Sequence, residues 1–273
     1  MTMATRIYKV DAFTDRPFSG NPAAVCILGA PRNEKWMQAV AREMNLSETA
    51  FITRKGKGTF GLRWFTPTTE VKLCGHATLA SAHIIYDKGI VPPGIPISFN
   101  TLSGELKASK RGEFIELDFP AQPGRQARAL PGLEKALGVR PKYVGVNRGL
   151  YYLVEVGSER AVRDLDPDMG LLRKISGKGG KSMHGVIVTS RASSKGYDFV
   201  SRFFAPAMGI DEDPVTGSAH CYLGPFWKER LGRDSFTAYQ ASKRGGTVKV
   251  TVHEDRVLLG GKAATVLEGE LKI

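Results

Sequence analysis

The sequence contains an internal repeat, in which three segments of the first half recur, in the same order, in the second half. The pairs are RWFTP at 63–67 with RFFAP at 202–206, GHA at 75–77 with GSA at 217–219, and GELKASKRGEFIELDFPA at 104–121 with GTVKVTVHEDRVLLGGKA at 246–263. The first pair is offset by 139 residues and the other two by 142, which one three-residue insertion explains. Ordered matches of this kind indicate duplication. Two long copies are not a solenoid, which needs three or more short repeats, so the sequence predicts two similar domains.

Hydrophobic periodicity predicts similar elements in both halves. The expected strands of the first half are 7–13, 23–28, 49–53 and 60–65, and the expected helices are 34–44 and 75–86. The helix from Gly75 is small or apolar nearly all round, which is typical of a buried helix. Its counterpart at 218–231 carries Pro225, which we expect to kink or divide it. A strand, a turn and a second strand follow each helix, at 104–119 and 246–259.

The sequence therefore predicts an α+β fold of two pseudo-symmetric domains, each a mostly antiparallel β-shell around a central helix. The predicted domains are 1–121 and 122–265, and a strand at about 266–273 is expected to return to the first. The segment 121–128, rich in Gln, Pro, Gly and Arg, is the best linker candidate.

Composition excludes several classes of protein. The chain has 273 residues, 42% of them apolar, which is enough for real cores. No apolar run approaches the roughly 20 residues that span a bilayer, and the polar N-terminus lacks the pattern of a signal peptide. We therefore expect a cytoplasmic protein without membrane contact. Cys26, Cys74 and Cys221 are odd in number and show no CxxC spacing, which argues against disulfides and a structural zinc.

The formal net charge of +12 raises the question of nucleic acid. The basic residues lie in short clusters in Gly-rich or hairpin-like stretches, and no aromatic residues are interleaved for base stacking. Solvated loops and strand faces explain this pattern better, so nucleic acid is not an expected partner. A positive field would also attract small anionic metabolites.

The two repeated helix starts suggest a binding function. A helix that begins with Gly75 or Gly217 offers backbone N–H groups and the positive end of its dipole, which suit a carboxylate. Thr216 and Ser218 can instead cap their helix. Asp213 and His76 stand beside these starts and could orient a substrate or relay a proton, although a structural histidine is the commoner role. Neither Cys74-x-His76 nor His220-Cys221 has a usual zinc spacing, so no metal site is expected.

Four longer strings carry a family resemblance. They are VDAFTDRPFSGNPAAVC at 10–26, NLSETAFI at 45–52, RWFTPTTEVKLCGHATLASAH at 63–83 and RFFAPAMGIDEDPVTGSAHC at 202–221. In order and spacing they resemble the phenazine-biosynthesis PhzF-like family, which shares the fold of diaminopimelate epimerase and proline racemase. The resemblance covers essentially the whole chain. It implies two similar domains with the active site in the cleft between them, a homodimer, and no metal or organic cofactor.

The resemblance also implies roles for individual residues. The acid/base carboxylate of the family falls on Glu48, and its supporting histidine, aspartate and serine fall on His76, Asp213 and Ser218. The residues around them that we expect to bind substrate are Gly20, Asn21, Cys74, Gly75, Ala77, Thr216 and Gly217. The implied function is an isomerase that moves a proton between carbons of a small carboxylated, cyclic metabolite. Without the resemblance, Glu48 three residues after Asn45 looks like part of a helix-capping box.

Two other functions stay open at this point. One is a racemase or epimerase, which in this fold uses two thiols just before the paired glycines. Here these positions hold Cys74 and Thr216, and the hydroxyl of threonine is too weak an acid to replace a thiol. The other is a non-catalytic small-molecule-binding protein, against which the intact set Glu48, His76, Asp213 and Ser218 argues.

Overall fold

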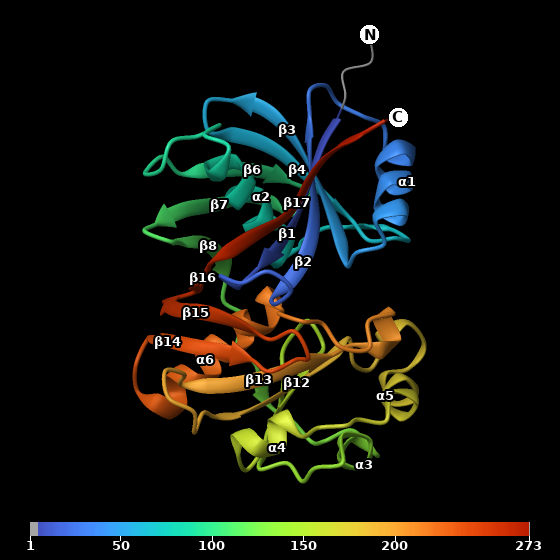
Figure 1. Ribbon diagram of the computed structural model, residues 1–273. Helices are drawn as coiled ribbons and strands as arrows, with labels where there is room; N and C mark the ends of the chain where they lie inside the picture. The colour runs from blue at the N-terminus through green and yellow to red at the C-terminus, as the bar shows by residue number, and fades with distance from the viewer. Residues whose placement is uncertain (1–4, 273) are drawn as a thin grey trace. The chain divides into compact units, whose positions relative to one another are not determined.

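The structure, a computed structural model, describes residues 5–272 and divides into two compact units (Figure 1). Unit 1 takes its described residues from 1–119 and 258–273, and unit 2 consists of 120–257. The C-terminal strand belongs to unit 1, where it pairs antiparallel with the first strand. None of the helices in 5–272 is both long enough and apolar enough to cross a membrane.

Unit 1 contains eight strands in a continuous pairing order, β17–β1–β2–β3–β4–β6–β7–β8, with the short β5 on β4. Its elements are β1 (Thr5–Ala12), β2 (Asn21–Leu28), α1 (Glu34–Met44), β3 (Glu48–Gly56), β4 (Thr59–Phe65), β5 (Glu70–Val71), α2 (Gly75–Asp87), β6 (Ile97–Thr101), β7 (Gly104–Arg111), β8 (Phe114–Pro120) and β17 (Ala263–Leu271).

Unit 2 contains seven strands in the order β9–β10–β11–β12–β13–β14–β15. Its elements are β9 (Arg125–Gln126), α3 (Leu133–Leu137), β10 (Tyr143–Val146), β11 (Tyr151–Glu155), α4 (Glu159–Arg163), α5 (Met169–Ser176), β12 (Gly185–Arg191), β13 (Phe199–Phe204), α6 (Gly217–Leu231), β14 (Ser235–Gln240) and β15 (Gly246–His253), with 3₁₀ turns at Lys178–Gly180 and Pro206–Met208. Strand β16 (Arg256–Gly261) spans the boundary between the two residue ranges.

Parallel and antiparallel strand pairs alternate in the same order in both units. Along β1–β2–β3–β4–β6–β7 the pairs are antiparallel, parallel, antiparallel, parallel and antiparallel, and the pairs along β10–β11–β12–β13–β14–β15 repeat this order. Each parallel pair is joined through helix, as parallel connections require: α1 and α2 in unit 1, and α4–α5 and α6 in unit 2. The α+β class with a duplicated unit is confirmed.

An ion pair of the same design occurs in both copies of the repeat. Arg63 donates to Glu70 through Nε and Nη2, at 2.6 and 2.7 Å, and Arg202 donates to Glu212 through the same atoms, at 2.7 and 2.9 Å. The two partners stand 7 and 10 residues after their arginine. The three-residue insertion inferred from the offsets therefore lies inside this segment. The bidentate ion pair is present in both copies despite the insertion.

The central helices are buried because small residues let strands approach them. Helix α2 contacts β1, β2, β3, β7 and β17, and ten of its 13 residues are buried. In α6, a Cβ added to Gly224 would lie only 3.0 Å from the side chains of Val250 and Val252. A larger residue would push β15 away from the helix.

Of the two outcomes expected at Pro225, a kink or a division of α6, the division is wrong, because α6 is one helix from Gly217 to Leu231. Pro225 has no N–H, so it cannot bond to the carbonyl of Cys221 one turn earlier. The backbone N–H of Gln122 donates to that carbonyl instead, at 2.9 Å. The helix thus keeps its acceptor satisfied across the proline.

Candidate active site

Asn21 is positioned by a glycine turn. Gly20 has a φ of +64°, and a Cβ there would lie 2.1 Å from the carbonyl oxygen of Ala12. Only glycine fits where the backbone approaches Ala12 so closely. After this turn, Asn21 is the first residue of β2. Asn21 is fully buried, and its Nδ2 donates to Nδ1 of His76 at 3.1 Å.

Glu48 does not belong to a capping box, so that interpretation is wrong. Asn45 ends α1 in the left-handed conformation, with a φ of 49°, and its backbone N–H donates to Ala41. Glu48 is the first residue of β3, opposite Ala23 of β2. Its side chain is 12% exposed, and Oε2 lies 3.2 Å from Nε2 of His76. The parallel pairing of β2 and β3 therefore places this carboxylate, and no helix end uses it.

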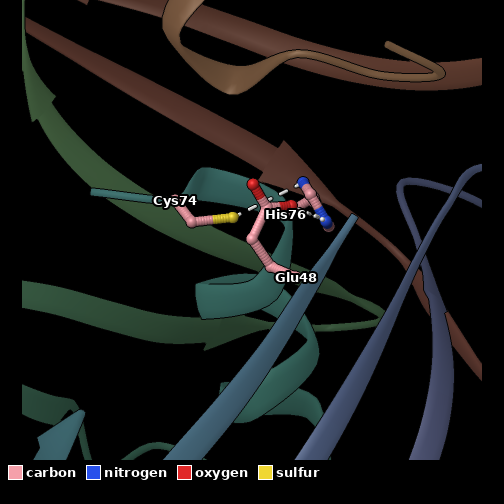
Figure 2. Close-up of side chains that lie close together, drawn as sticks. All are labelled: Glu48, Cys74 and His76. Carbon is pink, nitrogen blue, oxygen red and sulfur yellow. Dashed lines mark hydrogen bonds and ion pairs between the residues drawn. The ribbon is translucent and has the colours of Figure 1, made fainter. Parts of the chain in front are cut away.

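Cys74 and His76 come from the start of α2. Cys74 occupies the N-cap position of α2 but makes no capping hydrogen bond with its side chain. Its thiol lies 3.6 Å from Nδ1 of His76. Figure 2 shows the three side chains directed toward one another, Glu48 from β3 and the other two from the helix start. We call Asn21, Glu48, Cys74 and His76 the unit 1 cluster.

Hydrogen bonding determines which atoms of the unit 1 cluster can exchange protons. An amide N–H can only donate, so Nδ1 of a neutral His76 must accept from Asn21, and the ring proton then lies on Nε2, toward Glu48. Neither Oε2 of Glu48 nor Nε2 of His76 has a well-aligned hydrogen bond within the described part of the chain. The carboxylate is thus largely shielded from water, and Nε2 of His76, at 3.2 Å, is the contact described for Oε2.

Burial and neighbouring charges set the protonation of Cys74 and His76 in the unit 1 cluster. Burial, with Glu48 close by, raises the pKa of Cys74 to about 11, so Cys74 is a thiol near neutral pH. Burial lowers the pKa of His76, but the opposite effect of Cys74 and Glu48 is larger. The resulting pKa lies above the ordinary value for histidine.

The same residues offer the donor types of a metal site. One ligand atom each of Glu48, Cys74 and His76 lies within 4.8 Å of the other two. However, the thiol and the carboxylate contact opposite nitrogens of the imidazole, and the thiol is protonated. Zinc needs donors that converge on one point and a cysteine thiolate, so this arrangement fits a metal poorly.

Two of the other predicted residues, Asp213 and Thr216, lie in a hydrogen-bonded network of unit 2. Thr216 is the residue before α6, yet it does not cap the helix, so that alternative is wrong for Thr216. Its hydroxyl donates to Oδ2 of Asp213 at 2.5 Å. Gln240, at the end of β14 and fully buried, accepts from the backbone N–H of Thr216 at 2.9 Å and donates to the carbonyl of Asp213 at 2.7 Å. Its Nε2 also faces the hydroxyl of Thr216 at 3.2 Å, which directs the hydroxyl proton to the aspartate.

Ser218 lies in the first turn of α6, and its Oγ is 3.4 Å from the hydroxyl of Tyr151. Tyr151 is the first residue of β11 and half-buried. We call Asp213, Thr216, Ser218, Gln240 and Tyr151 the unit 2 cluster. Sequence reasoning missed Gln240 and Tyr151, because neither stands in a recognisable motif.

The remaining predicted residues form the helix starts. Gly75 and Gly217 are the first residues of α2 and α6, and Ala77 is fully buried in the first turn of α2. The contacts described for His76 are all with unit 1, and a pairing of His76 with Asp213 stays a prediction.

Comparisons with known proteins show the family and the fold of the chain. Residues 10–269 match the family model PhzC-PhzF, described as phenazine biosynthesis-like protein. An uncharacterised isomerase of Halalkalibacterium halodurans is 55% identical, over 98% of this chain and 99% of its own length. An uncharacterised isomerase of Pseudomonas aeruginosa is 47% identical, over 99% of this chain and its whole length. The crystal structure of a PhzF family phenazine biosynthesis protein from Enterococcus faecalis superposes with a TM-score of 0.92 at 40% identity, covering 99% of this chain and all of that one.

Proposed function

Because the chain belongs to the PhzC-PhzF family of phenazine biosynthesis-like proteins, we propose that it is a cofactor-independent isomerase. It moves a proton between carbons of a small carboxylated, cyclic metabolite, works as a homodimer, and uses Glu48 as its acid/base group. The similarity to proteins named isomerases supports the reaction class, and the position of Glu48 supports the residue.

The observation that carries the proposal is the environment of Glu48. A solvated carboxylate is a weak base toward carbon acids, because water stabilises its charge. Glu48 is 12% exposed, and its Oε2 lies 3.2 Å from His76 without a well-aligned hydrogen bond. A carboxylate with so few partners is available to accept a proton.

The reaction needs no redox change. Glu48 removes a proton from one carbon, the electron pair delocalises over the conjugated substrate, and Glu48 returns the proton to a second carbon of that system. His76 orients the carboxylate through Nε2. The N–H groups at the start of a helix suit the carboxylate of the substrate.

Two observations favour this reaction over a racemase. A two-thiol racemase needs a second thiol at Thr216, whose hydroxyl is committed to Asp213 at 2.5 Å. The first thiol, Cys74, is protonated near neutral pH because its pKa is raised to about 11. One carboxylate that acts on one face of a substrate needs neither thiol.

Deuterium wash-in tests the proposal. Carboxylated cyclic metabolites are incubated with the protein in heavy water, and exchange at carbon is followed by NMR. Glu48→Gln is expected to slow the exchange by roughly 10²- to 10⁴-fold, the usual contribution of a positioned acid/base group. Glu43→Gln, at an exposed position of α1, is the matched control and should exchange at the normal rate. Normal exchange by Glu48→Gln would show that another group moves the proton.

A further inference from the structure

Trp64 of β4 lies on the same face of the unit 1 sheet as Glu48. Side chains alternate along a strand, so Ala50 of β3 faces the same way as Glu48, two residues earlier. Trp64 stands directly opposite Ala50 in the antiparallel pair of β3 and β4 and therefore shares this face. Phe51 and Phe65, the next residues of the two strands, lie on the other face, in the hydrophobic cluster that includes residues of α1.

Glu48 and Trp64 are diagonal neighbours across the two strands. The register pairs Trp64 with Ala50, and Glu48 is displaced from Ala50 by two residues along β3. Diagonal neighbours on one face have Cα atoms roughly 7–8 Å apart, and aromatic and long side chains reach across this distance. The indole and the carboxylate are therefore within reach of one another.

The indole N–H of Trp64 is a buried donor without an acceptor. Trp64 is 1% exposed, and its Nε1 makes no hydrogen bond within residues 5–272. An indole N–H can only donate, and buried tryptophans usually have a partner for it. Trp227 shows the ordinary case, because its Nε1 donates to Oγ1 of Thr189 at 3.1 Å. An unsatisfied buried donor requires an explanation, and an acceptor that reaches it only part of the time provides one.

The carboxylate of Glu48 is an acceptor that suits this donor. Its Oε2 lies 3.2 Å from Nε2 of His76 but makes no well-aligned hydrogen bond within the described residues. Rotation about the side-chain bonds of Glu48 can bring the carboxylate toward Trp64 while the backbone of β3 stays in place. A hydrogen bond to an ionised group is stronger than one between neutral groups, so a buried carboxylate gains from a second donor.

We propose that Trp64 is a positioning residue for Glu48, whose carboxylate exchanges between two donors, Nε2 of His76 and Nε1 of Trp64. The role of this exchange in catalysis rests on the proposed isomerase function. A carboxylate that removes a proton from one carbon and returns it to another must occupy two positions, and Trp64 holds it at one of them. The contact itself does not depend on the reaction, and it involves side chains of unit 1 alone.

The indole N–H signals in ¹⁵N-labelled protein test the contact directly. The chain has three tryptophans, so single substitutions to Phe at Trp36, Trp64 and Trp227 assign the signals. A hydrogen bond to a carboxylate moves an indole proton downfield. The proton of Trp64 should therefore move upfield in Glu48→Gln, because the charge is lost. It should move further downfield in His76→Phe, because the carboxylate then loses its contact with Nε2 and spends more time at Trp64.

The other two tryptophans are internal references for this measurement. Trp36 lies on α1, and Trp227 already has Thr189 as its acceptor, so neither signal should move in Glu48→Gln or His76→Phe. If Trp64→Phe does not fold, the substitutions of Trp36 and Trp227 still assign the signal of Trp64 by elimination.

Glu48→Asp separates the contact from the charge. Aspartate keeps the negative charge but is one methylene shorter, so it should not reach Trp64, and the indole proton should move upfield as it does in Glu48→Gln. Glu43→Asp, at an exposed position of α1, is the matched control and should leave the signal in place.

Deuterium exchange at carbon tests the positioning role. Trp64→Phe should slow the exchange roughly 10-fold or more, the usual effect of losing a hydrogen bond to a charged group. Trp36→Phe is the control and should exchange at the normal rate. Thermal unfolding of both variants checks that they are folded. Normal exchange by a folded Trp64→Phe would overturn the positioning role.

A Trp64 signal that stays in place in Glu48→Gln and His76→Phe would overturn the proposal, as would a shift in the same direction in both. This result is separate from the test of the proposed function. If Glu48→Gln exchanges deuterium normally while the signal moves as expected, the proposed function fails and the contact stands. If Glu48→Gln loses exchange while the signal stays in place, the proposed function stands and the contact with Trp64 is rejected.

Discussion

The starts of α2 and α6 descend from the same repeated segment, but their side chains are held in different ways. In unit 1, the residue before the helix is Cys74, and its neighbours Glu48 and His76 both keep a buried polar atom without a well-aligned hydrogen bond. In unit 2, the residue before the helix is Thr216, which donates directly to the carboxylate of Asp213 and is also joined to this residue by three polar contacts of Gln240. The carboxylate of Glu48 in unit 1 is available for a proton, whereas the carboxylate of Asp213 in unit 2 accepts a hydrogen bond from the hydroxyl of Thr216.

This difference indicates that the two copies of the helix start have different roles, one in chemistry and one in stability. A half-satisfied group costs stability but can react, whereas a satisfied network is rigid and holds a geometry. The comparison therefore predicts that substitutions at the start of α6 change stability, and that substitutions at the start of α2 change chemistry more than stability.

Gln240→Leu should have the largest effect on stability. Leucine has a similar size but leaves the buried N–H of Thr216 and the carbonyl of Asp213 without their partner. At about 1–3 kcal/mol for each of the two groups that lose this partner, the free energy of unfolding should fall by about 2–6 kcal/mol, measured by urea denaturation. Gln126→Leu, at an exposed position of β9, should stay within about 0.5 kcal/mol. An unchanged midpoint for Gln240→Leu would break the comparison at its central claim.

Glu159 tests how a carboxylate that accepts several hydrogen bonds contributes to stability. Burial raises its pKa, but hydrogen bonds from Ser194, Ser193 and Arg163 outweigh burial and hold the pKa at about 2. Because this folded-state pKa lies below the ordinary value, the stabilisation is complete above about pH 4.5 and is lost as the pH falls toward 2. The loss is at most about 3 kcal/mol, from about 1.4 kcal/mol for each unit of pKa shift. Urea unfolding between pH 2 and 5 should show this slope, and Glu159→Gln should flatten it. A slope that survives in Glu159→Gln would assign it to other carboxylates.

Cys74→Ser should have the smallest effect. Serine is close in size and can still donate to Nδ1 of His76, so the change in unfolding free energy should be within about 1 kcal/mol. Deuterium exchange at carbon should be largely retained, because the thiol takes no part in the proposed reaction. Inversion at an α-carbon that Cys74→Ser abolishes would instead promote the racemase alternative.

The sequence predicted most of the fold, because duplication and periodicity are local signals. The helices at 34–44 and 75–86 and the strands around them were placed within a few residues of the observed elements. The family resemblance, which the family model confirms, supplied the rest of the architecture. The continuity of α6 across Pro225 was not predicted, because the N–H that replaces the one proline lacks comes from Gln122, far away in the chain.

The candidate site was less predictable from local patterns. Glu48 resembled a capping residue until Asn45 proved to end its helix, and only the family motif pointed to the carboxylate. Gln240 and Tyr151 carry no motif, since strand pairing brings them to the start of α6 from β14 and β11. Contacts that depend on the register of distant strands cannot be read from a local pattern.

The carbonyl of Cys221 that Pro225 leaves open has a consequence for how unit 2 is assembled. The N–H that fills it belongs to Gln122, which lies 99 residues earlier in the chain. Helix α6 therefore cannot complete its own hydrogen bonds as it coils, and the missing bond forms only when a loop of this length closes. Closing such a loop costs chain entropy, and contacts of this sequence separation form slowly. Protection of the Gln122 amide from hydrogen exchange should appear only once unit 2 has closed on itself.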